Sequence, residues 1–458
     1  MANLATAEDR GDARHIAARL ERLPYCSWHT KMRLIICTAW FFDAYDSVAI
    51  AYVLPPLIGL WHLTPQQIGS LISIGFAGQL VGALGFGWIA ERWGRLNSMI
   101  ITLLLFTLGA LACAFATNYE TLLSLRFIQG VGLGGEVPLM AAYVNEFAKA
   151  HNRGRFSVSI QVLFSIALFF VALTGVWVVP HLGWQWMFLI GAVPALLALP
   201  LRMILPESPR WLASQGRYAE ADAALARIET VAVREGKEPE PLPASLPAVA
   251  EVKPRIADLF KGIYRRRTIT VWFMWIGAYF VSYALNAWAP SLFRTVYHLP
   301  VETALQYGLF TSAIGLCASA LTIWLIEAWG RKPMLIMSFS GCCVFMLSFA
   351  FLPQLSAIGT LLVTTSGFFF LGFSLLSLAT YTAEIYPTHL RALGGGVASA
   401  WQRGASMVGT YLVGFILPNW GINAVFVVFG LFALIGAIAT IFFAIETRRQ
   451  VLEQLSPA

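Results

Sequence analysis

The chain has 458 residues, of which 58% are hydrophobic and only 12% are charged. A soluble protein carries about 25% charged residues on average, so this composition excludes an ordinary soluble domain. The formal net charge is +7, but Lys and Arg collect at the ends of long apolar segments rather than on a separate basic patch. That distribution argues against a nucleic-acid partner.

Long apolar segments follow a polar N-terminal segment, residues 1–32. Six are predicted within residues 33–205, at roughly 34–60, 68–90, 97–117, 121–144, 156–180 and 184–205. Six more are predicted within residues 268–445, at roughly 268–293, 304–327, 333–352, 357–383, 393–417 and 422–445. Because about 20 apolar residues cross about 30 Å of hydrocarbon as a helix, we predict an all-α membrane protein with twelve transmembrane helices in two six-helix bundles.

Residues 206–267 form a hydrophilic linker between the two groups, and residues 446–458 form a short tail. The linker, the N-terminal segment, the tail and every second connection are basic, whereas the alternate connections contain a single Arg294. This asymmetry predicts that both termini and the linker are cytoplasmic. The chain contains no Asn-x-Ser/Thr acceptor, which favours a bacterial inner (cytoplasmic) membrane.

Charged landmarks of the first half recur in the same order in the second half, 236 to 238 residues later. The matched pairs are Glu91 with Glu327, Arg95 with Arg331, Glu146 with Glu384, and Arg153 with Arg391. Such a repeat predicts two pseudo-symmetric bundles built from one structural unit, with a site where they meet.

Four motifs together resemble the major facilitator superfamily: Gly87-x3-Glu91-Arg92-x-Gly94-Arg95, Arg126-Phe-Ile-Gln-Gly130, Pro206-Glu-Ser-Pro-Arg-Trp-Leu212 and Glu384-Ile-Tyr-Pro387-x3-Arg391. The resemblance covers about residues 30–447 and is closest to the branch of sugar porters, organic-ion and synaptic-vesicle-type transporters, and bacterial niacin and aromatic-acid permeases. Organic-ion transporters of animals carry a large extracellular domain after the first span, whereas here that connection is only about Trp61–Gln67. The chain therefore looks like a bacterial member, and most like the niacin permeases. The second copy of the first motif has Ile323 and Ala328 in place of glycine and arginine, which predicts a weaker charge network there.

Charged residues at the cytoplasmic helix ends are expected to form a network that holds each half together or holds the cytoplasmic gate shut. These gate residues are Glu91, Arg92, Arg95, Glu146, Arg153, Glu384 and Arg391. The alternative is that they only anchor the helix ends at the lipid interface.

A few charged residues fall inside the predicted spans, where each is costly unless it is paired or lines a cavity. Asp46 lies about 20 Å into its helix and Arg126 about 8 Å from the outer end of its own, so their depths match and they could pair. The resemblance to proton-coupled sugar porters implies that Asp46 and Arg126 couple transport to protons, with Asp43 one turn away. A static ion pair is the alternative, in which case the protein would be a facilitator or would be coupled through Asp43 or Glu136.

Arg403 stands about 15 Å into its helix with no acid within a turn of the sequence. An arginine at that depth needs an anionic partner, which a transported carboxylate would supply in bidentate geometry. The resemblance supports this, because relatives that carry organic anions tend to have a basic residue in this helix. A structural arginine capped by carbonyl groups is the alternative.

Aromatic and amide side chains occur at similar depths, and a planar aromatic acid suits flat aromatic walls better than a sugar does. The predicted substrate-binding residues are Arg403, Tyr279, Tyr283, Asn286, Trp288, Gln402, Trp401, Asp43, Gln161 and Phe369. Tyr279 and Tyr283 are four residues apart and Asn286 follows on the same helix face.

The sequence therefore predicts a monomeric secondary transporter that imports a small aromatic monocarboxylate, nicotinate first, with protons and within a lipid bilayer. A proton/sugar symporter is the alternative, and a non-transporting membrane sensor is the alternative from another class. We expect no cofactor, no metal and no catalytic residues, because the sequence contains no nucleophile–base pair, metal-ligand cluster or phosphate-binding glycine loop.

Overall fold

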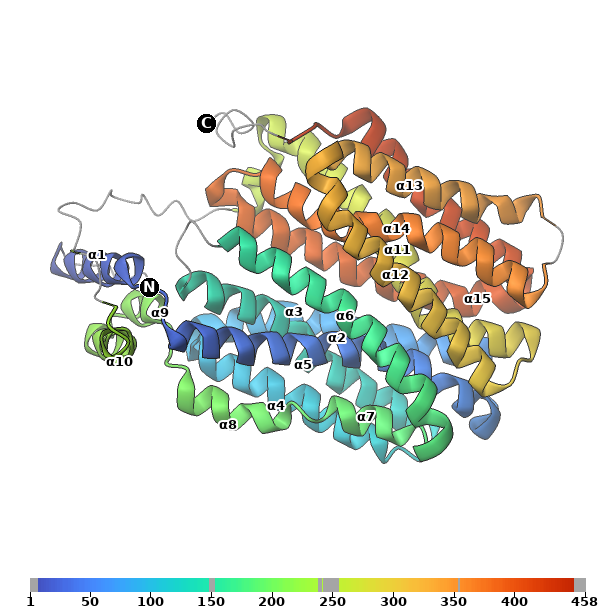
Figure 1. Cartoon of the computed structure of the whole chain (residues 1–458), viewed down its shortest axis with the longest axis horizontal. Coiled ribbons are helices and arrows are strands. Elements are labelled where there is room, and N and C mark those ends of the chain that lie inside the picture. The colour runs from blue at the N-terminus through green and yellow to red at the C-terminus, as the bar shows by residue number, and fades with distance from the viewer. Residues whose placement is uncertain (1–6, 148–152, 238–240, 242–254, 353–354, 449–458) are drawn as a thin grey trace.

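A computed structural model describes residues 7–147, 153–237, 241, 255–352 and 355–448, and the regular structure of these residues is helical. Two groups of long helices lie side by side, one from the first half of the chain in blue to green and one from the second half in yellow to red (Figure 1). Three short helices, α1 (Ala7–Arg22), α9 (Pro209–Ser214) and α10 (Tyr218–Arg234), lie beyond one end of the first group. We call that end of both groups the linker end and the opposite one the far end.

The first bundle consists of α2 (Ser27–Trp61), α3 (Pro65–Trp93), α4 (Arg95–Ala114), α5 (Tyr119–Phe147), α6 (Arg153–Leu182), α7 (Gln185–Gly191) and α8 (Ala195–Ile204). Its sixth span is divided, because α7 ends at Gly191 and α8 begins only after Pro194. Proline has no N–H group to donate and disfavours helical geometry in the residue before it, so it interrupts the hydrogen-bond ladder at that place.

The second bundle consists of α11 (Gly262–Tyr297), α12 (Val301–Trp329), α13 (Arg331–Leu347), α14 (Ala357–Ile385) and α15 (Thr388–Phe443). The α15 segment contains two spans, because Gly421 adopts a φ of 78° and reverses the chain at the far end. Glycine reaches this region of φ without the steric cost that a Cβ atom would add. A short 3-10 helix (Ile256–Phe260) leads into α11.

The predicted twelve spans in two bundles are confirmed. Nine helices of the described chain are long and apolar enough to cross a membrane. The count reaches twelve because α15 holds two spans, α7 and α8 share one, and α5 forms another although it carries Arg126 and Glu136.

The predicted repeat extends to the backbone at two places. The helices α2 and α11 contain 35 and 36 residues, and each is followed by a histidine, His62 or His298, with a φ of 51°. The turns from α3 to α4 and from α12 to α13 place Gly94 and Gly330 at φ 97° and 98°. The same unit is therefore built twice in local detail as well as in helix order.

The bundles pack against each other through α2 with α11, α3 with α15, and α6 with α12. Their backbones approach closely toward the far end, where a Cβ atom on Gly414 would lie 2.5 Å from the carbonyl oxygen of Pro65. Nearby, the hydroxyl groups of Tyr52 and Ser312 lie 3.2 Å apart across the same interface. The two halves are thus in close contact at the far end.

At the linker end, α1 packs on α9 and α10. Its Arg19 forms ion pairs with Glu229 at 2.6 Å and with Asp222. The backbone N–H group of Ser27, at the start of α2, donates to Glu235 at 2.9 Å. Carboxylates of α10 therefore hold the N-terminal segment against the linker helices.

We expect acid to release α1 from α10. Burial raises the pKa of the Glu229 carboxyl, but the hydrogen bond and the charge of Arg19 lower it by more than burial raises it. The pKa of Glu229 therefore lies below its ordinary value. Hydrogen bonds from Ser27 and Lys237 lower the pKa of Glu235 to about 2. A carboxylate with a lowered pKa stabilises the docked state above its ordinary pKa, about 4.3, and loses this effect as the pH falls.

Spin labels on the exposed faces of α1 and α10 would test this by their distance distribution. We expect one short distance near neutral pH and a broad, longer distribution as the pH falls through the range from about 4.3 to about 2. An unchanged short distance at the acid end of this range would contradict the assignment.

Candidate substrate-binding site

A cavity of about 200 Å³ lies between the two bundles, near the middle of the long helices. Both halves line it: α2, α3, α5 and α6 from the first, and α11, α14 and α15 from the second. Its polar and aromatic lining residues are Asp43, Ser47, Gln79, Ser282, Asn286, Ser399, Gln402, Arg403, Trp40, Phe164, Trp275, Tyr279 and Tyr283. Six of the predicted substrate-binding residues, Asp43, Tyr279, Tyr283, Asn286, Gln402 and Arg403, are among them.

Arg403 is the cationic side chain of this cavity lining, and only 7% of its surface is exposed. Its Nη1 atom donates to the hydroxyl oxygen of Ser399 at 2.6 Å and to the Ser399 carbonyl oxygen at 3.2 Å. Its Nε atom has no hydrogen-bond partner among the described residues. The guanidinium group therefore keeps unused donor capacity in a buried site.

Asp43 lines the same cavity from the opposite bundle. It is buried, and its Oδ1 atom has no hydrogen-bond partner within the described part of the chain. No ion pair within 4.0 Å joins it to Arg403 among the described residues, although the two charges lie close enough to interact. The sequence contains no acid within a helical turn of Arg403. In the structure Asp43, from the other half of the molecule, lines the same cavity as Arg403.

Three aromatic rings of α11 form a continuous wall of the cavity. The ring centroids of Trp275 and Tyr279 lie 5.0 Å apart at an interplanar angle of 17°, and those of Tyr279 and Tyr283 lie 5.8 Å apart at 26°. Residues four apart stack on one face of a helix, so this wall follows directly from the spacing. Phe164 of α6 approaches the edge of the wall, with its centroid 6.4 Å from that of Tyr283.

Three other predicted residues, Trp288, Trp401 and Phe369, lie outside the cavity lining. Trp288 is fully buried and donates from Nε1 to the carbonyl oxygen of Thr410 at 2.9 Å. It comes nine residues after Tyr279, which turns it to the opposite face of α11. Trp401 is 40% exposed and packs on Trp272.

Phe369 packs among its neighbours Phe370 and Phe373 on α14. The side chain of Gln161 falls outside the described residues.

Four polar residues of the lining escaped the sequence prediction: Ser47, Gln79, Ser282 and Ser399. The amide nitrogen of Gln79 donates to the hydroxyl oxygen of Ser47 at 3.4 Å. Gln79 sits in the middle of an apolar span, which is the signal that could have identified it. The serines offered none, because a serine in a transmembrane helix often bonds only to its own backbone.

Asp46 and Arg126 are both buried in the first bundle, and Gln129 bridges them. The Nη1 atom of Arg126 donates to Gln129 Oε1 at 2.8 Å, and Gln129 Nε2 donates to Asp46 Oδ2 at 2.5 Å. The described residues contain no direct ion pair between Asp46 and Arg126; Gln129 joins the two side chains instead. Gly191, at the break of the sixth span, lies so close that a Cβ atom there would stand 2.7 Å from Asp46 Oδ1.

Glu136 of α5 is fully buried, and neither of its carboxyl oxygens has a hydrogen-bond partner among the described residues. Its neighbours Leu133 and Val137 line the cavity. Its charge would interact with those of Asp43 and Asp46, so the three carboxyl groups form one buried cluster.

At the linker end, Arg95 joins three segments of the first bundle. It pairs with Glu91 at 2.7 Å and with Glu146 at 3.2 Å, while its backbone N–H group donates to Glu207 at 2.9 Å. Arg92 instead lies over the ring of Trp88, with its guanidinium carbon 4.2 Å from the ring centroid.

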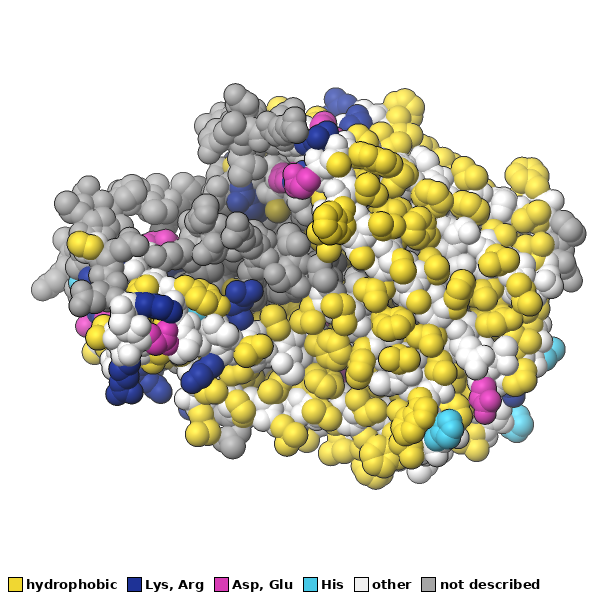
Figure 2. All heavy atoms as spheres, in the orientation of Figure 1, with side chains coloured by type: hydrophobic (Ala, Val, Ile, Leu, Met, Phe, Trp, Pro, Cys, Tyr) yellow, Lys and Arg dark blue, Asp and Glu magenta, His cyan; other side chains and the backbone are white. Residues whose placement is uncertain are grey.

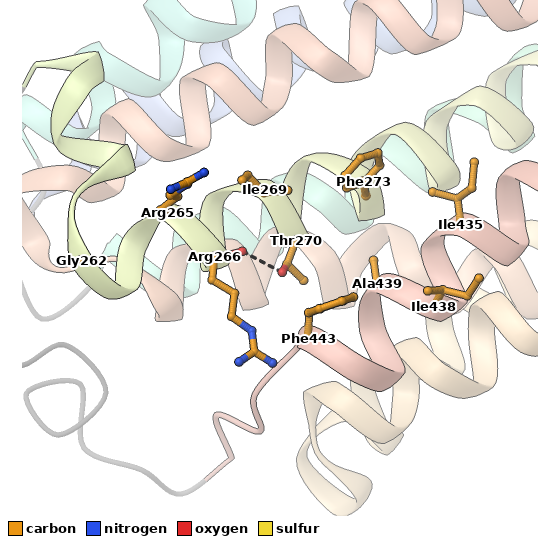
Figure 3. Close-up of a pocket in the computed structure, with 10 residues that line it drawn as sticks. All are labelled: Gly262, Arg265, Arg266, Ile269, Thr270, Phe273, Ile435, Ile438, Ala439 and Phe443. Carbon is orange, nitrogen blue, oxygen red and sulfur yellow. Dashed lines mark hydrogen bonds between the residues drawn. The ribbon is translucent and has the colours of Figure 1, made fainter.

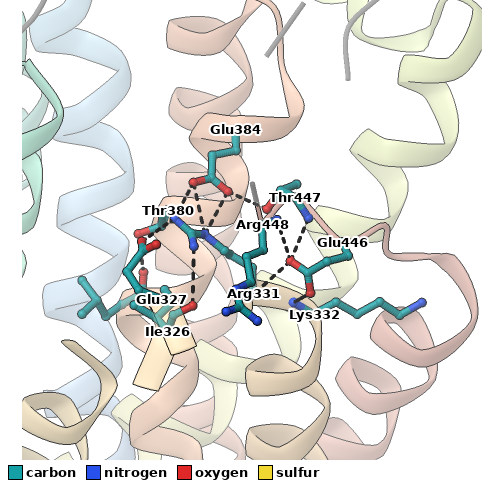
Figure 4. A network of polar contacts seen from close by, with 10 residues as sticks. Ile326, Glu327, Arg331, Lys332, Thr380, Glu384, Glu446, Thr447 and Arg448 are labelled. Carbon is teal, nitrogen blue, oxygen red and sulfur yellow. Dashed lines mark hydrogen bonds and ion pairs between the residues drawn. The ribbon is translucent and has the colours of Figure 1, made fainter. Parts of the chain in front are cut away.

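Arg331 repeats this arrangement in the second bundle (Figure 4). It pairs with Glu327 at 2.8 Å and with Glu384 at 2.9 Å, and its backbone N–H group donates to Glu446 at 3.1 Å. The expected weakening of the second network is therefore wrong, because the losses at Ile323 and Ala328 leave every partner of the central arginine in place.

The ion pairs of these two networks lie within each bundle, so among the gate residues the described contacts support holding each half together. Arg391 has a buried Nε atom without a described hydrogen-bond partner, and the side chain of Arg153 falls outside the described residues. The sequence analysis did not include Glu207 and Glu446 among the gate residues, although they form a third pair of matched acids in the repeat. Their interval of 239 residues could have identified them, because it places each beside the corresponding turn of its half.

The cavity, the repeat and the helix order can be compared with known proteins. A family model described as "Sugar (and other) transporter" matches residues 36–458. The niacin transporter NiaP of Acinetobacter baylyi is 33% identical over 452 residues, which cover 96% of this chain and 99% of that protein. The inner membrane metabolite transport protein YgcS of Escherichia coli is 28% identical, with 94% of each chain covered.

Among solved structures, the partially occluded inward open conformation of the xylose transporter XylE from E. coli matches with a TM-score of 0.73. The match covers 93% of this chain and 100% of that chain at 22% identity, a level at which the likeness concerns the fold. The chain thus belongs to the sugar (and other) transporter family of the major facilitator superfamily and is a multi-pass membrane transporter rather than an enzyme.

Proposed function

We propose that this transporter carries a small aromatic monocarboxylate, with nicotinate as the best single candidate, by alternating access of the cavity between the bundles. The observation that carries the proposal is Arg403 beside the stacked wall of Trp275, Tyr279 and Tyr283. A guanidinium group binds a carboxylate through two parallel hydrogen bonds, and aromatic faces stack on a planar ring. The similarity to NiaP, named as a niacin transporter, supports the same substrate.

The size of the cavity also supports a one-ring substrate. A volume of about 200 Å³ corresponds to roughly seven water molecules at about 30 Å³ each. A single aromatic ring with one carboxylate fits such a space, whereas a substrate of two fused or linked rings would require the walls to move apart.

Asp43 suggests how protons are coupled to this substrate. A bound carboxylate at Arg403 would face the carboxylate of Asp43 across the same small cavity. Two like charges at close range in a buried site repel, and this repulsion favours proton uptake by one of them. We therefore infer that anion binding favours proton uptake by the buried cluster of Asp43, Asp46 and Glu136, with Asp46 as the group that carries the coupled proton.

We also propose that the arginine networks keep each bundle rigid while the bundles rock. Arg95 and Arg331 each tie two helices and a neighbouring segment together with partly buried charge-assisted contacts. Rocking of rigid repeats around a central site is the motion that duplicated transporter folds allow.

We also propose that the linker end, with both termini, lies at the cytoplasmic face of a bacterial inner membrane, which the basic residues of that end support through the positive-inside rule. The similarity to a protein named as an inner membrane transporter supports this location. Single-cysteine labelling from outside intact cells tests it: His62 and His298 replaced by cysteine should react, and Arg234 replaced by cysteine should not.

The substrate class is tested with a ligand panel and thermal shift of the purified protein. Nicotinate and benzoate should raise the melting temperature, because ligands that bind only the folded state stabilise it. Nicotinamide is the matched control, since it keeps the ring and loses the carboxylate, and it should have a much smaller effect. Stabilisation by nicotinamide equal to that by nicotinate would remove the carboxylate from the proposal.

A sugar is the second candidate, favoured by the amide groups of Gln79, Asn286 and Gln402 in the lining. Such groups hydrogen-bond hydroxyls, and the family model includes sugar transporters by its description. Hexoses and pentoses belong in the same panel. Stabilisation by a sugar with none by aromatic acids would replace the first proposal by the second.

The aromatic wall gives a separate prediction. Tyr279→Ala or Tyr283→Ala should weaken binding of the aromatic acid by about 1–3 kcal/mol, through loss of buried stacking area. Tyr411→Ala is the matched control, because Tyr411 is exposed and lies outside the cavity lining. Titration calorimetry measures the effect, and unchanged affinity in both cavity variants would place the ring against another wall.

A further inference from the structure

An apolar groove of about 550 Å³ runs along the outside of the second bundle, between the start of α11 and the last turns of α15. Its walls include Ile269, Phe273, Ile435 and Ile438, as Figure 3 shows. None of its lining residues lines the cavity between the bundles. The groove is therefore separate from the cavity between the bundles.

The walls of the groove are exposed apolar side chains on membrane-spanning helices. Figure 2 shows how widely such side chains cover one face of both bundles. Surface of this kind contacts lipid chains in a membrane, because the hydrocarbon region offers no water to cover it. An elongated hollow in that surface matches an acyl chain better than it matches a compact solute.

Two arginines stand at the mouth of the groove, in the first turns of α11. Arg266 donates from Nη2 to the carbonyl oxygen of Phe442 at 3.1 Å, and its guanidinium carbon lies 5.3 Å from the ring centroid of Phe443. These contacts hold its charge beside the groove (Figure 3). Arg265 is exposed and makes no ion pair with any described acid.

The acids near this mouth are already engaged elsewhere. Asp258 pairs with Lys261 at 2.7 Å, and Glu446 accepts from the backbone N–H groups of Arg331 and Lys332 at 3.1 Å each. Two positive charges thus remain without a described carboxylate at one end of an apolar groove. Phe273 lies seven residues after Arg266, which puts the apolar walls up to roughly 11 Å deeper along the helix.

We propose that this groove binds one anionic phospholipid of the leaflet at the linker end. The phosphate lies at Arg265 and Arg266, and one acyl chain runs along Ile269 and Phe273 between α11 and α15. Both parts of the site are needed for this ligand: a free phosphate would leave the apolar walls uncovered, and a zwitterionic lipid would bring its own ammonium cation beside the two arginines.

The charge is tested by native mass spectrometry of the purified protein with phosphatidylglycerol and with phosphatidylcholine of the same chains. The natural protein should retain phosphatidylglycerol preferentially. In R265Q/R266Q the ratio of retained phosphatidylglycerol to phosphatidylcholine should fall at least about fivefold. The matched control is R227Q/R234Q, which removes two exposed arginines from α10, away from the groove. If R265Q/R266Q does not fold, R265Q alone replaces it, because the Arg265 side chain makes no hydrogen bond or ion pair with the described residues.

The groove itself is tested by I438W, which fills it without changing the charge. This variant should bind both lipids less at the site, whereas I441W, on an exposed residue outside the lining, should not. Equal retention of the two lipids by the natural protein, or unchanged preference in R265Q/R266Q, overturns the proposal. Release of the lipid by excess inorganic phosphate alone also overturns it, because the site would then recognise an anion without its chain.

Discussion

Replacing Arg403 by alanine is expected to abolish measurable binding of the aromatic carboxylate while the protein still folds. The guanidinium group is buried in the cavity between the bundles and keeps an Nε atom without a described partner. Removing one member of a buried, hydrogen-bonded charge pair costs about 2–5 kcal/mol, or a factor of roughly 30 to several thousand in affinity.

Arg403→Lys should recover little of this loss, because an ammonium group cannot form the two parallel hydrogen bonds of the guanidinium fork. Arg294→Ala is the matched control, since Arg294 caps the Leu299 carbonyl near the far end and lies outside the cavity. Titration calorimetry with nicotinate gives the affinities. Near-natural affinity in Arg403→Ala would make Arg403 a structural residue held by Ser399.

Replacing Asp46 by asparagine is expected to stop uptake driven by a pH gradient and to leave ligand binding intact. Asp46 lies outside the cavity lining, at the end of the chain of hydrogen bonds from Arg126 through Gln129. A rearrangement of α7 and α8 at their break, next to Gly191, would change this contact and let the carboxylate take a proton. Asparagine keeps the size of the side chain but cannot carry that proton.

Proteoliposomes loaded at equal and at different pH separate the two effects. Asp46→Asn should retain exchange of labelled nicotinate at equal pH. Its accumulation of nicotinate driven by the pH gradient should fall at least about tenfold. Glu120→Gln, at an exposed end of α5, makes the same chemical change as a control. Unchanged accumulation in Asp46→Asn would make the protein a facilitator or transfer the coupling to Asp43 or Glu136, which are tested by the same substitution to the amide.

The twelve spans could be predicted from the sequence because each apolar run is long enough to cross the membrane and is separated from the next by charged or turn residues. The helix count and the repeat rested on hydropathy and on the spacing of Glu91, Glu146 and their counterparts. The division of the sixth span at Pro194 was missed, because α7 and α8 are both apolar and hydropathy alone cannot register a break between them.

The site was predictable where it depends on one helix and not where it depends on two. Tyr279, Tyr283 and Asn286 share a helix face by spacing, and all three line the cavity. Trp288 was predicted to bind the substrate from its residue type, although it comes nine residues after Tyr279 and so lies on the opposite face of the helix. The position of Asp43 beside Arg403 depends on how the bundles pack, which no local pattern in the sequence reports.

A structure of the protein with bound nicotinate tests the central claim most directly. The carboxylate should lie within about 3 Å of the guanidinium nitrogens of Arg403, with the ring parallel to Tyr279 or Tyr283. The same position with nicotinamide should be empty or weakly occupied. Nicotinate bound elsewhere between the bundles, with Arg403 still donating only to Ser399, would contradict the account.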